Sequence, residues 1–255
     1  MIYVTGDCHS DFFKLTRAAF PEQKDMTKDD TVIICGDFGG VWYEDDYFDE
    51  LKIENKRLDM LDDKPFTTVF VDGNHENFNR LEKLPVKEWN GGKVHVVRPS
   101  VLHLMRGEVF EIEVKKFFAF GGASSHDIRD GVIEMDTEGK WEETAKLWWY
   151  QNKMFRIKDL TWWEQELPTQ EEMDNGLLNL AKHGNKVDFI ISHCASSSVA
   201  SVFSAGLYKP DILTDYLEKV CTITDFEHHF FGHYHDNCRI MGNHNMLYEQ
   251  IVRIS

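Results

Sequence analysis

The chain has 255 residues, 42% of them hydrophobic, and a formal net charge of −16 at pH 7. This composition excludes a disordered chain and predicts a folded protein with a substantial core. The acidic balance argues against nonspecific binding to nucleic acid, which requires a basic surface, but it allows a small anionic substrate held by metal ions.

Five segments share one pattern, in which an apolar, β-branched run ends in polar residues at a turn. Such runs are typical of strands that are buried on both faces. The segments are MIYVTGDCH (1–9), TVIICGDFGG (31–40), TTVFVDGNHE (67–76), VDFIISHC (187–194) and HHFFGHYH (228–235).

Helical patterns lie between these strands. Residues 11–20 form one pattern, with Ser10 or Asp11 as the N-cap, and residues 46–62 form a longer amphipathic one. Further strands are expected at 94–97, 101–104, 108–114, 116–120, 238–241 and 246–252.

A third helix is predicted after Thr169. This residue forms a capping box with Glu172, and Gly184 is placed to end the helix. Alternating strands and helices imply an α/β protein, at the border with α+β. The later run of strands without intervening helices implies a second, more antiparallel sheet.

The chain contains no internal repeat or Gly/Ser-rich linker, so we expect one domain over residues 1–255. The exception to its regularity is the tract 121–168, which is rich in Trp, charge and Gly. Connections of this length are uncommon and are usually functional lids or insertions.

No apolar run reaches membrane-spanning length, and residues 1–13 lack a basic region followed by an apolar stretch. We therefore expect no membrane segment and no signal peptide. The five cysteines are scattered and form no CxxC pair. This favours reduced thiols and a cytoplasmic protein.

The polar strand ends are the candidate site. Ligands in open α/β sheets bind beyond the carboxyl ends of the strands. Residues i and i+2 of extended backbone point the same way, so Asp7 with His9, and His233 with His235, are each expected to converge. The full set is Asp7, His9, Asp37, Asn74, His75, His193, His233 and His235.

The set contains three oxygen donors and four histidines as candidate ligands, with His75 left over. These donors fit two metal ions of intermediate softness, such as Mn²⁺, Fe, Zn²⁺, Co²⁺ or Ni²⁺. Ca²⁺ does not suit so many imidazoles.

Most other histidines, and all cysteines, are expected outside the site. No cysteine lies in a convincing ligand position, and those at strand ends, Cys8, Cys35 and Cys194, fit small buried hydrophobes. Surface or core packing is expected for His95, His103, His183, His228, His229 and His244.

The motif order GDxH, GD, GNHE, SH, GHxH resembles that of the calcineurin-like metallophosphoesterase family, from Asp7 to His235. The resemblance implies two mixed β-sheets packed face to face, with helices outside. It implies one metal held by Asp7, His9, Asp37 and His235. It implies a second metal held by Asp37, Asn74, His193 and His233, so that Asp37 bridges the two.

The resemblance also implies a mechanism. Two metals about 4 Å apart bind the phosphoryl oxygens and lower the pKa of a bridging water, and the resulting hydroxide attacks phosphorus. His75 is not a ligand and acts at the leaving group as a proton donor. The adjacent Glu76 is the candidate acidic group for raising the pKa of His75.

Two motifs of this chain differ from those of the protein Ser/Thr phosphatases of the family and argue against that function. The second motif reads GDFGGVW without an Asp-Arg-Gly run, and SHCASS stands where those enzymes have a His-Gly-Gly element. The stretches FGGASSHDI and MFRIKDLTWWEQELPTQEE instead resemble those of a bacterial and phage-type metallophosphoesterase group. The matching positions are Ser125, Asp127, Arg156, Trp162, Trp163 and Glu166.

Two interpretations of these positions stay open. In one, Arg156 receives a phosphate or carboxylate and the pair Trp162–Trp163 stacks on a nucleobase. In the other, the tryptophans pack the tract onto the sheet and Arg156 pairs with Asp127 or Glu166. His126 and Arg129 are weaker candidates for substrate contact.

The function expected from the whole sequence is that of a dinuclear metal-dependent phosphoesterase acting on a small phosphomonoester or phosphodiester. The alternatives are a metal-dependent nuclease, a protein phosphatase, or a scaffold with vestigial turnover. Superfamily nucleases normally carry larger DNA-binding extensions, and this chain is acidic. We therefore expect a small phosphorylated substrate and no binding to long nucleic acid.

Overall fold

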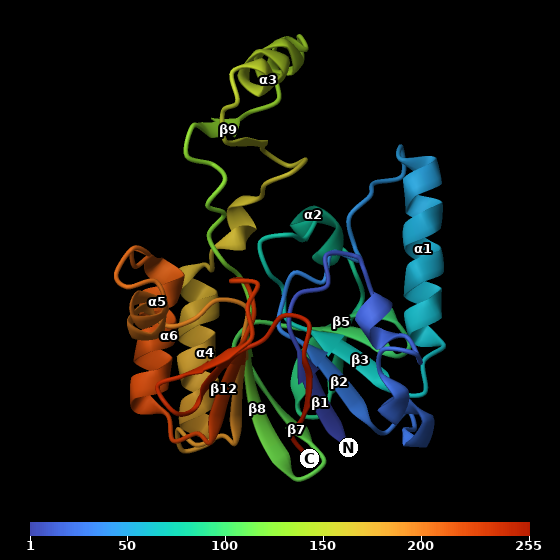
Figure 1. Ribbon diagram of the computed structural model, residues 1–255, viewed down its shortest axis with the longest axis vertical. Coiled ribbons are helices and arrows are strands. Elements are labelled where there is room, and N and C mark those ends of the chain that lie inside the picture. The colour runs from blue at the N-terminus through green and yellow to red at the C-terminus, as the bar shows by residue number, and fades with distance from the viewer.

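A computed structural model describes residues 1–255 and contains two large β-sheets (Figure 1). The strand order of the first sheet is β15-β1-β2-β3-β6-β5-β4. Strands β1, β2, β3 and β6 run parallel, and the other three pair antiparallel at its edges. The bounds are β1 (Ile2–Thr5), β2 (Thr31–Ile34), β3 (Thr67–Phe70), β4 (Val86–Trp89), β5 (Gly92–Arg98), β6 (Val101–Leu104) and β15 (Ile251–Arg253).

The second sheet has the order β13-β14-β12-β11-β8-β7. Its four inner strands are parallel, and β13 and β7 are antiparallel edge strands. The bounds are β7 (Glu108–Ile112), β8 (Lys115–Phe120), β11 (Phe189–Ser192), β12 (His228–Phe231), β13 (Cys238–Ile240) and β14 (His244–Met246).

The two sheets pack face to face with helices on their outer faces (Figure 1). A buried cluster between them includes Ile33 and Val69 from the first sheet and Phe117 and Ile191 from the second. Helix α1 covers the first sheet, and α4 and α6 cover the second. The helices are α1 (Phe48–Asp62), α2 (Phe78–Leu81), α4 (Gln170–Lys182), α5 (Ser197–Phe203) and α6 (Ile212–Ile223). The fold is therefore the four-layer sandwich that the sequence predicted.

Most predicted elements are confirmed. The five apolar segments form β1, β2, β3, β11 and β12, and the strands expected between 94 and 120 form β5 to β8. The strand expected at 238–241 is β13. The 46–62 pattern is α1, and α4 begins with the predicted capping box of Thr169 and Glu172. Gly184 follows its last turn with a φ of +68°.

The expectation of a more antiparallel second sheet is wrong. The consecutive strands at 94–120 do not form one sheet, because β5 and β6 join the first sheet and β7 and β8 join the second. The inner strands of the second sheet are parallel because α4 and α6 precede β11 and β12 as crossover helices.

Two further expectations are wrong. Residues 11–20 contain only a 3₁₀ turn, η1 (Phe13–Leu15), in which Lys14 Nζ donates to three backbone carbonyls, including that of Asp7 at 2.7 Å. The strand expected at 246–252 is split between β14 and β15, since the chain crosses there from the second sheet to the first.

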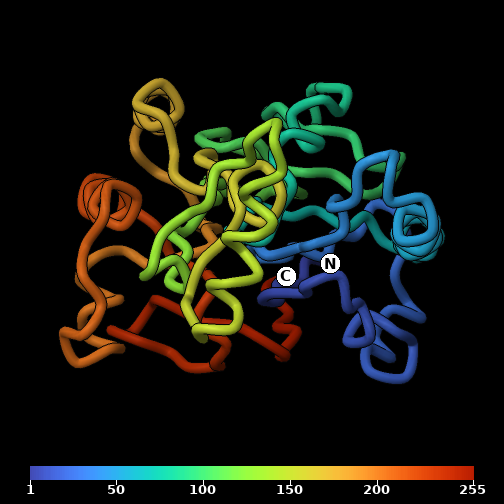
Figure 2. The backbone as a smooth tube through the Cα atoms, turned by 90° about the horizontal axis from the view of Figure 1, so that it is seen from above, coloured from blue at the N-terminus to red at the C-terminus, as the bar shows by residue number.

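The tract 121–168 rises from the edge at which the central strands end (Figures 1 and 2). It contains β9 (Gly131–Ile133), α3 (Lys140–Tyr150), β10 (Phe155–Ile157) and the 3₁₀ helix η3 (Glu164–Glu166). Strands β9 and β10 form a separate two-stranded parallel sheet. No residue of α3 is buried, so the tip of the tract adds nothing to the core.

None of the helices combines the length and the apolar character that crossing a membrane requires.

Candidate metal centre

The first predicted ligand group comes together at the carboxyl ends of β1, β2 and β12. His235 Nε2 lies 3.2 Å from Asp7 Oδ2 and 3.0 Å from His9 Nε2. His9 Nε2 lies 3.7 Å from Asp37 Oδ2. The ligand atoms of these four residues all lie within 4.8 Å of one another, a spacing at which one ion can contact all four.

The second predicted group adjoins the first through Asp37. His193 Nε2 lies 3.2 Å from Asp37 Oδ1, and the ring centroids of His193 and His233 are 5.0 Å apart. Asn74 comes from the end of β3, and its amide donates to Ser125 Oγ at 3.4 Å. Asp37 thus presents one oxygen to each group.

The prediction for residues i and i+2 assumed extended backbone at these strand ends, but the backbone there is not extended. His9, Asp37, His233 and His235 have φ angles of 46°, 44°, 68° and 51°. Left-handed backbone is costly for residues other than glycine and is found mostly where function requires it. The side chains converge because of these turns, and alternation along a strand is not the cause.

Two glycines make room for the carboxylates. A Cβ at Gly73 would lie 2.1 Å from Asp37 Oδ1, and a Cβ at Gly232 would lie 2.0 Å from Asp7 Oδ1. Any larger residue at either position would displace a candidate ligand.

The buried carboxylates of the site require a compensating positive charge. The side chains of Asp7 and Asp37 are 0% and 2% exposed, and neither pairs with a lysine or arginine. Burial by itself lowers the pKa of His193, but the charge of Asp37 outweighs it and raises that pKa to about 10. The same interaction with His193 holds the pKa of Asp37 well below its usual range despite burial. The site therefore favours a cation beside Asp37.

Two buried polar atoms point to a metal as that cation. His193 Nδ1 bonds to the carbonyl oxygen of Cys35 at 2.8 Å, so Nδ1 carries the proton. A metal-ligating histidine is typically oriented in this way. His193 Nε2 and Asn74 Oδ1 are both buried without a hydrogen-bond partner. Carboxylate, amide and imidazole donors of this kind fit divalent transition metals.

His75 lies beside the two groups. Its backbone N–H donates to Asp37 Oδ1 at 2.8 Å, and its ring lies 5.0 Å from that of His9. Burial lowers the pKa of His75, and Arg156, whose Nη2 lies 3.5 Å from His75 Nε2, lowers it further.

Glu76 is not the acidic partner of His75. Its carboxylate accepts the backbone N–H of Phe38 at 2.7 Å and that of Gly39 at 3.2 Å. Full burial raises the pKa of Glu76 well above its ordinary value. The prediction failed because these bonds hold the Glu76 carboxylate against the backbone of the second motif.

Of the two interpretations of Arg156 and the tryptophans, the contacts favour packing. Arg156 binds Asp127 Oδ2 through Nε at 2.8 Å and Nη2 at 2.6 Å. Trp163 is 1% exposed and packs edge-on against Trp42. Trp162 is only partly buried. Glu166 is 1% exposed, accepts the backbone N–H of Ser125 at 3.2 Å and forms no salt bridge with Arg156.

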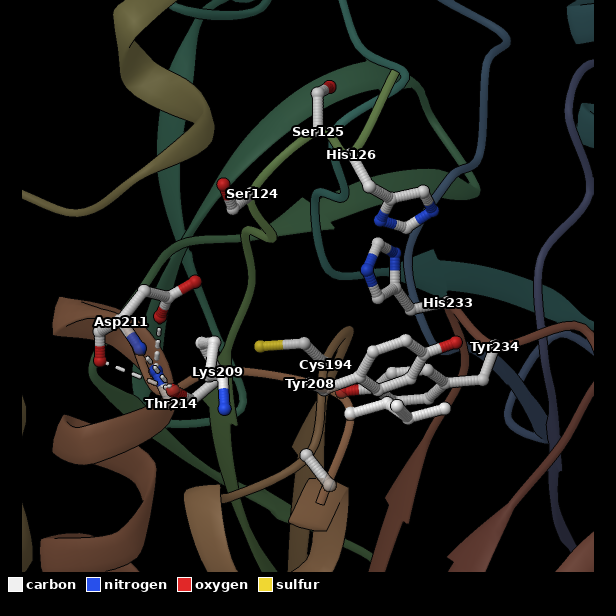
Figure 3. A pocket seen from close by; sticks show the side chains of 12 residues that line it. Ser124, Ser125, His126, Cys194, Tyr208, Lys209, Asp211, Thr214, His233 and Tyr234 are labelled. Carbon is white, nitrogen blue, oxygen red and sulfur yellow. Dashed lines mark hydrogen bonds between the residues drawn. The ribbon is translucent and has the colours of Figure 1, made fainter. Parts of the chain in front are cut away.

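A cavity of about 240 Å³ opens beside the second ligand group (Figure 3). The rings of His126 and His233 face each other at 4.9 Å and form one end. Tyr208 and Tyr234 stack at 5.5 Å, and Lys209 is the cationic residue of the lining. Sequence reasoning missed both tyrosines and Lys209, although Tyr234 lies between the two histidines of the last motif.

Comparison with known proteins agrees with this geometry. The profile of the calcineurin-like phosphoesterase family matches residues 1–237. Lariat debranching enzyme A of Xenopus laevis is 27% identical over 169 residues, which are 62% of this chain and 30% of that enzyme. The lariat debranching enzymes of Danio rerio and Homo sapiens are 28% and 27% identical over 143 residues, which are 52% of this chain and 24% and 25% of those enzymes.

The match thus spans less than a third of each of these relatives. The family profile, in contrast, covers every strand that contributes a candidate ligand. The chain therefore belongs to the calcineurin-like phosphoesterase family.

Proposed function

We propose that the protein binds two divalent transition metals and hydrolyses a small phosphomonoester or phosphodiester. The observation that carries this proposal is the position of Asp37. One of its oxygens lies 3.7 Å from His9 and the other 3.2 Å from His193. A carboxylate between two donor sets is the arrangement that holds a pair of ions in phosphoester hydrolysis.

The proposed ligands are divided as the family resemblance implies. Asp7, His9, Asp37 and His235 hold one ion, and Asp37, Asn74, His193 and His233 hold the other. When bound, such a pair neutralises charge on the phosphoryl group and supplies an activated water.

We assign His75 to the leaving oxygen as a proton donor. It lies next to the ligands without belonging to either group. Its pKa is lowered in the free protein, and an anionic phosphoryl group bound beside it would raise that pKa. The same anion would give the guanidinium of Arg156 a second acceptor besides Asp127.

The organic part of the substrate is proposed to enter the cavity of Figure 3. Its volume of about 240 Å³ suits a compact group, and its tyrosine pair and Lys209 suit a planar, anionic one. His126 and Asp127, at the base of the tract 121–168, lie between this cavity and Arg156. We further propose that residues 1–255 are one domain, in which this tract is an insertion that restricts access.

A second candidate function is hydrolysis of a phosphodiester within a nucleic acid. The matches to enzymes named for debranching lariats favour it. Those matches cover 24% to 30% of the relatives, and the net charge of −16 opposes binding of a long polymer. We therefore place it second.

The test is turnover of p-nitrophenyl phosphate and bis(p-nitrophenyl) phosphate by protein loaded with Mn²⁺. We expect hydrolysis of at least one of them, with the ratio showing whether monoesters or diesters are preferred. Removal of metal with a chelator should abolish the rate, and Mn²⁺ should restore it. A metal-loaded protein that hydrolyses neither ester would instead support the scaffold.

A further inference from the structure

A second group of metal-ligating side chains lies outside the site described above. It consists of Cys221 in α6, His229 in β12 and His244 in β14, with ligand atoms within 4.8 Å of one another. His229 lies within β12, whereas the proposed ligand His233 lies in the turn after that strand ends at Phe231. The group is therefore separate from the catalytic edge.

The fold brings these residues together from three elements. Strands β12 and β14 are parallel, and their register places His229 opposite His244. Cys221 lies in the last turn of α6, the helix that covers this face of the sheet. None of the three belongs to a motif of the family resemblance.

The hydrogen bonds of His229 fix which nitrogen is free. Ser192 Oγ donates its hydrogen to the carbonyl oxygen of Cys194 at 2.7 Å, so it accepts from His229 Nε2–H at 2.6 Å. The lone pair of His229 is therefore on Nδ1, which faces His244 Nδ1 at 3.0 Å and Cys221 Sγ at 4.0 Å. A histidine whose second nitrogen donates to an oxygen is oriented as metal ligands are.

The distances are close to those of a tetrahedral zinc site. Zn–N bonds of about 2.05 Å and a Zn–S bond of about 2.3 Å place two nitrogens about 3.35 Å apart and a nitrogen and a sulfur about 3.55 Å apart. The corresponding separations here are 3.0 Å and 4.0 Å. Both separations differ from the ideal values by less than about 0.5 Å, and the ligand atoms of Cys221 and His244 lie within 4.8 Å of each other.

We propose that Cys221, His229 and His244 bind a structural Zn²⁺ ion that ties α6 to β12 and β14. Glu218 lies one turn before Cys221 on α6, and its charge acts on both Cys221 and His244. Its carboxylate accepts the backbone N–H of Ser198 at 2.9 Å, so a water molecule is proposed for the fourth position. The sulfur ligand distinguishes this site from the catalytic one, whose proposed donors are oxygen and nitrogen.

Absorption of the Co²⁺-loaded protein tests the proposal. A cysteine ligand gives Co²⁺ an intense thiolate-to-metal charge-transfer band in the near ultraviolet, and the proposed catalytic donors cannot produce it. We expect this band in the wild type, its loss in Cys221→Ser, and its retention in the control Cys238→Ser, which changes a cysteine in β13 outside the group. No band in the wild type, or a band that persists in Cys221→Ser, overturns the proposal.

Zinc content gives an independent measurement. Asp37→Ala should retain a single tightly bound zinc ion after dialysis, and the double variant Asp37→Ala/Cys221→Ser should retain none. Retention by the double variant would also overturn the proposal. Turnover of p-nitrophenyl phosphate by Mn²⁺-loaded Cys221→Ser should equal that of the wild type, so failure of the zinc site and failure of the proposed activity remain distinguishable.

Discussion

Asp37 is the residue on which both proposed catalytic metals depend. It is buried, its oxygens reach a histidine of each group, and its Oδ1 also accepts the backbone N–H of His75. Gly73 has no side chain because a Cβ there would collide with this carboxylate. One side chain would therefore fix the spacing of the two proposed metals and the position of His75.

Asp37→Ala should abolish binding of the catalytic metal pair and hydrolysis together. The reason is that the substitution removes an oxygen from each donor group at once. His235→Ala should weaken only the first group and His233→Ala only the second. Metal analysis of the purified variants after dialysis checks this. Two catalytic metals retained by Asp37→Ala would show that Asp37 does not bridge.

His75→Asn should keep normal metal content and lose rate. A general acid typically contributes about 10²–10⁴-fold, and its loss matters least for an ester with a good leaving group. The fall in kcat should therefore be smaller for p-nitrophenyl phosphate than for an alkyl phosphate. Loss of one metal from this variant would mean that His75 is a ligand.

At the scale of the elements, the tract 121–168 divides into a base and a tip. Its base contacts the site through Ser125, His126 and Arg156. Its tip, α3, exposes Trp149 and Tyr150 by 76% and 83% and stands away from the sheets (Figure 1). The two parts should respond differently to mutation.

Trp163, at the base, should matter to stability more than to catalysis. Trp163→Ala empties a position that is 1% exposed and should cost about 3–5 kcal/mol of the free energy of unfolding. Trp162→Ala, at the partly buried neighbour, is the matched control and should cost much less. Urea unfolding of both variants measures the difference. Equal small losses would return Trp163 to the candidates for substrate contact.

Replacing residues 136–152 at the tip with a short Gly/Ser linker should leave the core intact. No residue of α3 is buried, so the free energy of unfolding should change by about 1 kcal/mol or less. If the tip restricts access, turnover of the bulky diester should rise relative to the small monoester. A fall of both rates would show instead that the tip supports the site.

At the scale of the whole molecule, the charge and the fold act on the substrate in opposite ways. The net charge of −16 repels anions from most of the surface. At the site, the proposed metals together with Arg156 and Lys209 would attract them. This balance suits a small phosphate ester better than a polymer that must cross the acidic surface.

We therefore predict no measurable affinity for single- or double-stranded DNA at physiological salt. If the protein did bind single strands through phosphate contacts, the logarithm of affinity would fall with that of salt by roughly 0.7 per contact. Fluorescence anisotropy over a salt series measures this. Metal-dependent degradation of a long oligonucleotide that is abolished by His75→Asn would contradict this prediction and support a nuclease.

The sequence by itself determined the central strands, the layered fold and the residues that gather at the site. Parallel strands of a sheet end at one edge, so a polar residue after each apolar run can be placed there without coordinates. Long apolar runs and a capping box are also local signals, which is why β1, β2, β3, β11, β12 and α4 were predictable.

Only the tertiary structure decided which sheet each strand joined, which side chains met across elements, and where the cavity opened. Arg156 meets Asp127, Glu76 turns away from His75, and Cys221 approaches His229 through packing between separate elements. The left-handed turns at the ligands have the same origin, since packing around buried carboxylates outweighs the local preference of the backbone. Contacts of this kind depend on register and layer packing, which no local pattern in the chain encodes.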